Sequence, residues 1–159
     1  MYLNKRKIIF LISILSLVFL LTINDIKSQE LKVVDGDTIH LNGEKIRFTG
    51  IDTPELKQTC IKEGISNYCG VTAKQILINR IANNTVKCIS EGKDQYKRTL
   101  AECFVNNESL SSYLVRSGYA FAYRKYSEKF IEDENFAKTN QLGMWSMKFQ
   151  YPWDFRKNN

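Results

Sequence analysis

The stretch VDGDTIHLNGEKIRFTGIDTPE, residues 34–55, decides the fold of this chain. Two dipeptides that favour tight turns, Asp35-Gly36 and Asn42-Gly43, divide it into short segments. The segments on either side of the second turn, Thr38–Leu41 and Lys45–Thr49, alternate apolar with polar residues, as half-buried strands do. The stretch therefore predicts a β-hairpin whose turn is Asn42-Gly43.

Short strands are also predicted before and after this hairpin. Leu31–Val34 precedes the first turn, and Thr85–Ser90 and Thr99–Val105 flank a turn over Lys93–Lys97. Tyr119–Tyr126 is aromatic and is expected to be extended. Short strands with few helices between them predict an α+β domain, a small closed barrel with helices packed on it.

Three helices are predicted from capping residues and apolar spacing. The predictions are a helix from the capping box Thr72-x-x-Gln75 to about Ala82, a second over 108–117 capped by Asn107, and a third from Ser127 to about Leu142. The chain from Lys57 to Gly70 is expected to be a loop, and the tail from Met144 to Asn159 to be irregular.

The first 28 residues have the pattern of a targeting segment. Lys5, Arg6 and Lys7 precede Ile8–Ile23, an uncharged run of 16 residues. A membrane span needs about 20 apolar residues, so this run favours a signal peptide and a secreted or periplasmic protein. Ile26 fits poorly in a cleavage site at Ser28, which leaves an uncleaved N-terminal membrane anchor as the alternative.

Residues 29–159 are then long enough for one domain with its own core. Residues 1–28 carry +3 of the formal net charge of +6, so the remaining domain is only mildly basic. Such a surface is compatible with nucleic acid binding but does not demonstrate it.

Four cysteines, an even number behind a secretory signal, favour two disulfides. The midpoint between Cys88 and Cys103 lies at the centre of the turn over Lys93–Lys97, so the two residues are expected to face each other across the strands. This predicts the pairs Cys88–Cys103 and Cys60–Cys69. A zinc site with four cysteine ligands is the alternative, although the short Cys-x2-Cys spacing of such sites is absent.

Four charged side chains of the opening stretch have the chemistry that phosphodiester hydrolysis requires. The site needs a cation, donors to the phosphate oxygens and a base for water, because the anionic substrate gathers further negative charge in the transition state. Asp37 and Asp52 are hard oxygen ligands for Ca2+ or Mg2+. Arg47 can bind phosphate oxygens, and Glu55 can activate a water. Each residue alone also fits an ordinary turn or surface role, and only the combination favours a site.

With these residues and later motifs, the chain resembles the staphylococcal nuclease (thermonuclease) family over about Leu31 to Trp153. The motifs are Asp35-Gly36-Asp37-Thr38, Arg47 five residues before Asp52-Thr53-Pro54-Glu55, Asp94-x-Tyr96-x-Arg98-x-Leu100-Ala101, Leu114-Val115-Arg116-x-Gly118-x-Ala120 and Gly143-Met144-Trp145. The signal segment and the cysteines resemble those of secreted bacterial members.

The resemblance implies a five-stranded OB-type barrel with three helices, and Ca2+-dependent cleavage of DNA and RNA. Water attacks phosphorus and the 5′ oxygen leaves, giving 3′-phosphate ends. The matching positions are Asp37, Asp52 and Thr53 for the metal, the last through its backbone carbonyl, Glu55 for the general base, and Arg47 and Arg98 for phosphate binding. Lys97 stands where many members have glycine, which bears on the position of Arg98.

Other functions and partners are weighed against this one. Tyr96 and Tyr123 are candidates for stacking on a base or ribose, or for packing at the rim. Mg2+ or another divalent ion is an alternative to Ca2+. No protein partner is implied, a monomer is expected, and contact with a membrane depends on an uncleaved N-terminal segment. The alternative functions are a non-catalytic OB-type nucleic-acid-binding module and an anchored adhesive protein; the full set of carboxylates and arginines favours the enzyme.

Overall fold

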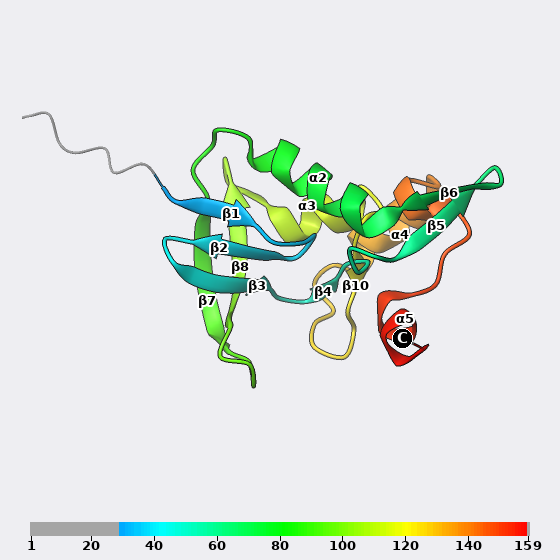
Figure 1. Ribbon diagram of the computed structural model, residues 1–159. Coiled ribbons are helices and arrows are strands. Elements are labelled where there is room, and N and C mark those ends of the chain that lie inside the picture. The colour runs from blue at the N-terminus through cyan, green and yellow to red at the C-terminus, as the bar shows by residue number, and fades with distance from the viewer. Residues whose placement is uncertain (1–28, 159) are drawn as a thin grey trace, which may run out of the picture.

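The structure, a computed structural model, describes residues 29–158, and the predicted targeting segment lies outside them (Figure 1). The strands are β1 (Leu31–Val33), β2 (Thr38–Leu41), β3 (Glu44–Phe48), β4 (Ile51–Asp52), β5 (Thr59–Lys62), β6 (Ile65–Tyr68), β7 (Lys87–Lys93), β8 (Thr99–Val105), β9 (Glu108–Ser109) and β10 (Phe121–Ala122). The helices are α2 (Cys69–Ile81), α3 (Leu110–Arg116), α4 (Ile131–Thr139), the 3-10 helix η1 (Gly143–Ser146) and α5 (Pro152–Asn158). None of the helices within 29–158 has the length and apolar character needed to cross a membrane.

The central sheet has the strand order β1-β2-β3-β8-β7, with β9 added to β8. The pair β3–β8 is parallel, whereas β1–β2, β2–β3 and β7–β8 are antiparallel. In Figure 1 the sheet curls, and α2 lies across one side of it. This arrangement confirms the predicted α+β class with a five-stranded OB-type sheet.

The β2–β3 hairpin forms as predicted around Asn42-Gly43. Both turn residues have positive φ, 51° and 83°, which is the twist that a two-residue hairpin loop requires. The register places Ile39 opposite Ile46, so both apolar side chains enter the core. The same register places Thr38 opposite Arg47.

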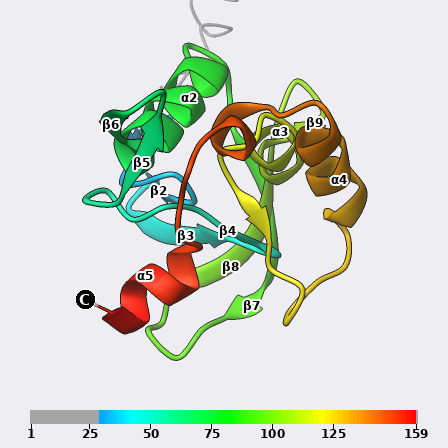
Figure 2. The same cartoon turned by 90° about the vertical axis from the view of Figure 1, so that its right-hand side faces the viewer.

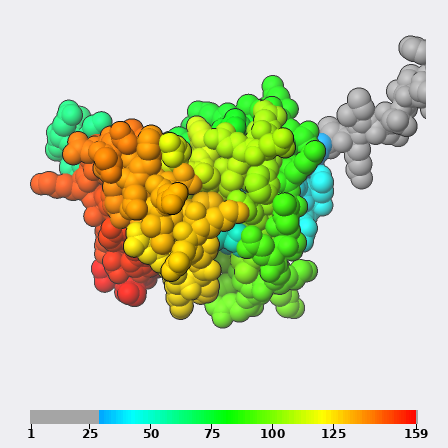
Figure 3. Space-filling model, turned by 180° about the vertical axis from the view of Figure 1, so that it is seen from behind, coloured from blue at the N-terminus to red at the C-terminus, as the bar shows by residue number. Residues whose placement is uncertain are grey.

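Two hydrophobic clusters hold the domain together. The main core lies between the sheet and the helices α2 and α3, and its largest fully buried members include Phe48, Leu77 and Leu114. The second cluster surrounds Phe121 and is built from the aromatic side chains of the C-terminal tail, Trp145, Phe149, Tyr151 and Trp153. The second cluster therefore fixes the tail to β10, and this end of the molecule lies away from the β1 edge (Figure 3).

Both predicted disulfides are present. Cys88 and Cys103 are register partners on β7 and β8, as the position of the turn predicted. Cys60 and Cys69 join the start of β5 to the first residue of α2. All four cysteines are therefore used in disulfides, and the zinc alternative is excluded.

The predicted loop over Lys57–Gly70 is wrong, because most of it is the hairpin β5–β6. Lys62 pairs with Ile65, leaving Glu63-Gly64 as a two-residue turn. Their φ values of 52° and 79° match the same kind of turn as Asn42-Gly43. Its strand residues are mostly exposed, so the apolar alternation that identifies a half-buried strand is missing from the sequence.

The predicted starts of all three helices are displaced. α2 begins at Cys69 rather than at Thr72, whose hydroxyl donates to the Tyr68 carbonyl instead of capping the helix. α3 is capped by Ser109, because Asn106 and Asn107 form the turn between β8 and β9.

α4 begins at Ile131 instead of Ser127, and it ends at Thr139 instead of Leu142. The Ser127 hydroxyl accepts from the Lys129 amide in a local turn. Small polar side chains bond to the nearby backbone in turns as well as at helix starts, which is why such residues alone misplace a boundary. The tail is not irregular throughout, since it contains η1 and α5.

Candidate functional site

Three of the predicted site residues meet where β2, β3 and β4 come together. Asp37 immediately precedes β2, Arg47 lies on β3, and Asp52 ends β4. The Arg47 guanidinium donates Nη1 to Asp37 Oδ1 and Nη2 to Asp52 Oδ1, the latter at 2.9 Å. Both carboxylates are buried, whereas the Arg47 side chain is 20% exposed. One guanidinium therefore bridges two buried carboxylates and still reaches the surface.

The second oxygen of Asp37 is held by Thr53. Oδ2 accepts from the Thr53 amide at 3.0 Å and from the Thr53 hydroxyl at 2.9 Å. A Cβ atom at Gly36 would lie 2.8 Å from that hydroxyl, so glycine is required for this approach. The glycine of the Asp35-Gly36-Asp37-Thr38 motif is therefore explained by its close packing against Thr53.

The electrostatics of this centre favour additional positive charge. The pKa of Asp37 is raised to about 7, mainly by burial and also by the nearby Asp35 and Asp52, against the opposing effect of Arg47. Burial lowers the pKa of Arg47, but Asp37 and Asp52 together raise it above its usual value. Two buried acids with one bridging guanidinium are short of positive charge.

Arg156, on α5, is a site residue that the sequence reasoning missed. Its Nη2 donates to Asp52 Oδ2 at 2.6 Å, and its Nη1 donates to Asp52 Oδ1 at 3.2 Å and to Glu55 Oε1 at 2.8 Å. Glu55 has a 44% exposed side chain and lies at the solvent side of the buried pair. Arg156 thus links Glu55 to the Asp37-Arg47-Asp52 centre.

The aromatic cluster explains why α5 reaches the site. The Trp153 ring stacks on Tyr151 at 4.6 Å between ring centroids and on Tyr123 at 5.7 Å. Arg156 follows Trp153 by about one helical turn, so it is carried to the carboxylates by that anchor. The only sequence signal for Arg156 was an arginine placed shortly after an anchoring tryptophan. The bonds from Arg156 to Asp52 join α5, red in Figure 2, to the end of β4.

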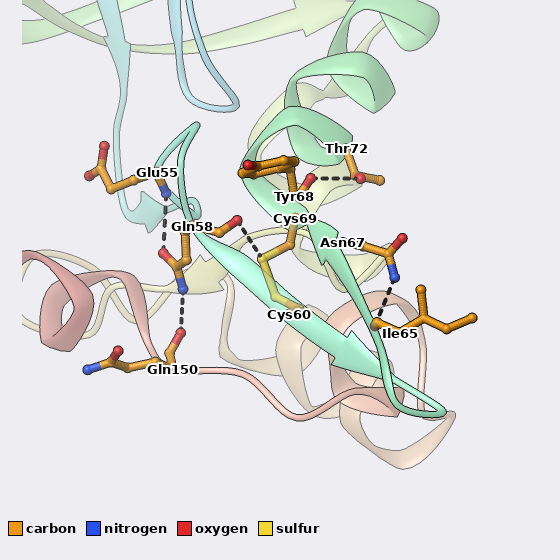
Figure 4. The surroundings of a disulfide bond; sticks show 9 residues. All are labelled: Glu55, Gln58, Cys60, Ile65, Asn67, Tyr68, Cys69, Thr72 and Gln150. Atoms are coloured by element: carbon orange, nitrogen blue, oxygen red, sulfur yellow. Dashed lines mark hydrogen bonds between the residues drawn. A yellow bond between two sulfur atoms is a disulfide. The ribbon is translucent and has the colours of Figure 1, made fainter.

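Gln58 connects the backbone at Glu55 to the same tail. Its buried side chain accepts from the Glu55 amide at 3.3 Å and donates to the Gln150 carbonyl at 2.6 Å. The Gln58 carbonyl accepts from the amide of Cys69, whose disulfide lies beside it (Figure 4). Glu55 is therefore positioned by the start of α2 and by the C-terminal tail together.

Arg98 lies on the turn between β7 and β8 and makes no described bond to the carboxylate centre. Its Nε donates to Asp94 Oδ2 at 2.7 Å, and its guanidinium lies over the Tyr96 ring, 5.5 Å from the centroid. Lys97 has a φ of 62°, so it adopts the conformation that a glycine would provide, and the turn closes.

The sheet nevertheless places this turn close to β3, because Thr99 is the register partner of Ile46. Tyr96 is 71% exposed and therefore free to contact a ligand, whereas Tyr123 is stacked in the aromatic cluster. The structure thus brings Asp37, Arg47, Asp52, Thr53 and Glu55 together, and leaves Arg98 and Tyr96 at a separate turn.

The donors present fit a hard divalent cation. Asp37 and Asp52 supply carboxylate oxygens that a single guanidinium can bridge. No cluster of three or more histidine, cysteine or acidic side chains suited to a metal occurs within residues 29–158, so the remaining ligands would be backbone carbonyls and water, which Ca2+ commonly accepts. Thr53 contacts Asp37 through its amide and hydroxyl, and its carbonyl is the predicted third ligand.

Comparison with known proteins identifies the family. Residues 45–147 match the family model described as staphylococcal nuclease homologue. The chain is 31% identical over 118 residues to a protein named succinoglycan biosynthesis protein ExoI from Rhizobium meliloti, covering 71% of this chain and 61% of that protein. It is 28% identical over 122 residues to an uncharacterized endonuclease from Haemophilus influenzae, covering 72% and 64%.

A third relative is the endonuclease YhcR of Bacillus subtilis, 34% identical over 146 residues, with 79% of this chain and 12% of that protein covered. The chain thus spans less than two thirds of the length of these relatives. The family model nevertheless takes in most of the domain, including Arg47, Asp52, Glu55 and Arg98. On this match and the carboxylate–arginine centre, the chain belongs to the staphylococcal nuclease family.

Proposed function

We propose that this protein is a metal-dependent nuclease that hydrolyses phosphodiester bonds in DNA and RNA, with Ca2+ as the metal. The observation that carries the proposal is the bridge from Arg47 to two buried carboxylates, with Glu55 at the open side. Relatives named as endonucleases and staphylococcal-like nucleases support the same reaction class.

Each residue has a role that follows from its position. Asp37 and Asp52 hold the cation, which when bound supplies positive charge to a phosphate oxygen. Arg47 is fixed by the same carboxylates and directs its exposed edge at a second phosphate oxygen. Glu55 is exposed enough to take a proton from water.

Bond changes balance without a further reactant. The water oxygen forms a bond to phosphorus, the bond from phosphorus to the 5′ oxygen breaks, and the water proton passes to Glu55. The leaving 5′ oxygen takes up a proton, and the other product ends in a 3′-phosphate. Arg98 is proposed as a second phosphate donor, because Asp94 engages only its Nε among the side-chain bonds described within residues 29–158.

The test uses labelled single-stranded DNA, duplex DNA and RNA. We expect cleavage of each with Ca2+ and none after chelation. The 5′-hydroxyl ends of the products should accept a kinase label directly, and their 3′ ends should be extended by a polymerase only after a phosphatase has removed the 3′-phosphate. Binding without cleavage in Ca2+, Mg2+ and Mn2+ would instead support the non-catalytic OB-type module.

We also propose that the protein is secreted or periplasmic. The basic and apolar pattern of the N-terminal segment supports this, as do two disulfides of the kind that persist outside the cytoplasm. N-terminal sequencing of the mature protein distinguishes a cleaved signal peptide from a retained anchor. A sequence beginning near residue 29 is expected, and an intact residue 1 would indicate the anchor.

A further inference from the structure

The position of Arg156 raises the question of how a cation reaches Asp52. Asp52 Oδ1 already accepts from Arg47 and Arg156, and its Oδ2 accepts from Arg156 at 2.6 Å. Glu55 Oε1, on the predicted base, accepts from the same Arg156 guanidinium at 2.8 Å. A guanidinium therefore occupies both oxygens of one predicted metal ligand and one oxygen of the predicted base.

We propose that Arg156 competes with the divalent cation for Asp52, so that metal binding and the docking of Arg156 oppose each other. The inference rests on the proposed function, because it takes Asp37 and Asp52 as the metal ligands. It assigns to the C-terminal helix a role that the family match does not cover, since the matched region ends at residue 147.

The charge balance supports competition. The centre holds three carboxylates, Asp37, Asp52 and Glu55, and two guanidinium groups, Arg47 and Arg156. Withdrawal of Arg156 removes one positive charge from this group, whatever the charge of its other members. A divalent cation therefore binds more favourably when Arg156 is withdrawn.

Withdrawal of Arg156 from its carboxylates should cost less free energy than withdrawal of Arg47. The Arg156 side chain is 41% exposed, whereas Arg47 is 20% exposed and bridges two buried acids. An exposed guanidinium that leaves a carboxylate regains water. Trp153 keeps the displaced Arg156 close to the site, but α5 is then held less firmly because it has lost the bonds to Asp52 and Glu55.

Arg156 contacts the predicted base as well as the predicted metal ligand. The Arg156 contact occupies Oε1 of Glu55, so the same displacement that admits the cation also frees this oxygen of the predicted base. Thermodynamic linkage requires the reverse effect as well. The factor by which docked Arg156 lowers the affinity for the cation is the factor by which the bound cation weakens the docking of Arg156 and α5.

Calcium binding measured by isothermal titration calorimetry tests the inference without using activity. We expect Arg156→Gln to tighten Ca2+ binding by about fivefold, the scale of a well-formed but partly exposed ion pair. Arg156→Lys keeps the charge but loses the two-point contact, and should lie between the wild type and Arg156→Gln. Thermal unfolding confirms that each variant is folded.

Lys157→Gln is the matched control, because it removes the same charge from the same helix. Lys157 pairs only with Asp154 among the described ion pairs, at 3.5 Å. The Lys157→Gln variant should therefore bind Ca2+ with the affinity of the wild type, within about twofold. Equal tightening by both variants would assign the effect to overall charge and would overturn the competition. Unchanged or weaker binding in Arg156→Gln would also overturn it.

Hydrogen exchange supplies the reciprocal measurement. Addition of Ca2+ should speed exchange in the α5 peptide of the wild type and leave that of Arg156→Gln unchanged. Slower exchange on Ca2+ addition in the wild type would contradict the inference. If Ca2+ binds neither the wild type nor any variant, both the calcium assignment and the competition fail, whereas equal Ca2+ binding by the wild type and Arg156→Gln refutes only the competition.

Discussion

Arg47 bonds to two buried carboxylates at once, so it has a structural role beside the phosphate binding that we propose for it. Without it, Asp37 and Asp52 would face each other with no buried cation, and the pKa of Asp37 is already raised by burial. We expect Arg47→Ala to lower the free energy of unfolding by about 3 kcal/mol, the scale found when one partner of a buried pair is removed.

The same substitution should also abolish most of the cleavage, since it removes the proposed phosphate donor. Thermal unfolding in chelator and cleavage in Ca2+ measure the two effects separately. Arg116→Ala is the control for loss of an arginine, because its ion pair to Asp133 is long, at 3.4 Å, and half-exposed. An Arg47→Ala variant as stable as Arg116→Ala would contradict the buried bridge.

Several side chains that the sequence nominates lie together in the structure, whereas Arg98 and Tyr123 lie apart from them and Arg156 was not nominated. Asp37, Arg47, Asp52 and Glu55 are close in the chain and lie on adjacent strands, so their assembly follows from the hairpin. Arg156 is 104 residues from Asp52, and its contact depends on how an aromatic tail packs. No local pattern encodes that approach.

The buried side chain of Gln58 joins the backbone at Glu55 to the C-terminal tail at Gln150. Gln58→Leu keeps the volume but leaves the Glu55 amide and the Gln150 carbonyl without their side-chain partner. We expect a loss of about 2 kcal/mol in the free energy of unfolding, the cost of an unsatisfied buried polar group, and a lower turnover because Glu55 loses its support.

Chemical denaturation and initial cleavage rates measure these two effects. Gln75→Leu is the control, since the one side-chain bond of Gln75 described within residues 29–158 goes to Asn79 on the exposed face of α2. Normal stability and turnover in Gln58→Leu would show that neither the Glu55 backbone nor the tail depends on this side chain.

Elements that are determined by local sequence features could be predicted, whereas those that depend on contacts between distant residues could not. The β2–β3 hairpin follows from apolar alternation and an Asn-Gly turn, both local features. The β5–β6 hairpin has exposed residues and no such alternation, and the first amide of α2 is satisfied by the carbonyl of Gln58, a partner eleven residues earlier. α5 has only seven residues and gains its stability from ring stacking rather than from its own periodicity.

The two disulfides lie in different regions of the molecule, one within the central sheet and the other beside the candidate site. Cys88–Cys103 ties β7 to β8 within the sheet, whereas Cys60–Cys69 joins β5 to α2 next to Glu55. At Gly70, a Cβ atom would lie 2.0 Å from the Glu55 carbonyl, which shows how closely α2 packs against that backbone.

Removing each disulfide by paired serine substitutions should therefore have different consequences. Each pair should cost about 3 kcal/mol of stability in the chain-entropy description. Loss of Cys60–Cys69 should also lower turnover at temperatures where the protein is folded, and loss of Cys88–Cys103 should leave turnover closer to the wild type. Melting curves and cleavage rates in parallel provide the comparison, and the reverse order of turnover would contradict this expectation.

We propose that Glu55 activates water at a metal held by Asp37 and Asp52. The most direct measurement is the rate of Ca2+-dependent DNA cleavage by Glu55→Gln beside the wild type and Glu63→Gln, a control for loss of an exposed carboxylate on the β5–β6 turn. We predict that Glu55→Gln loses about 100-fold or more of the rate while it still binds the substrate, and that Glu63→Gln cleaves normally. Full activity in Glu55→Gln would contradict the account.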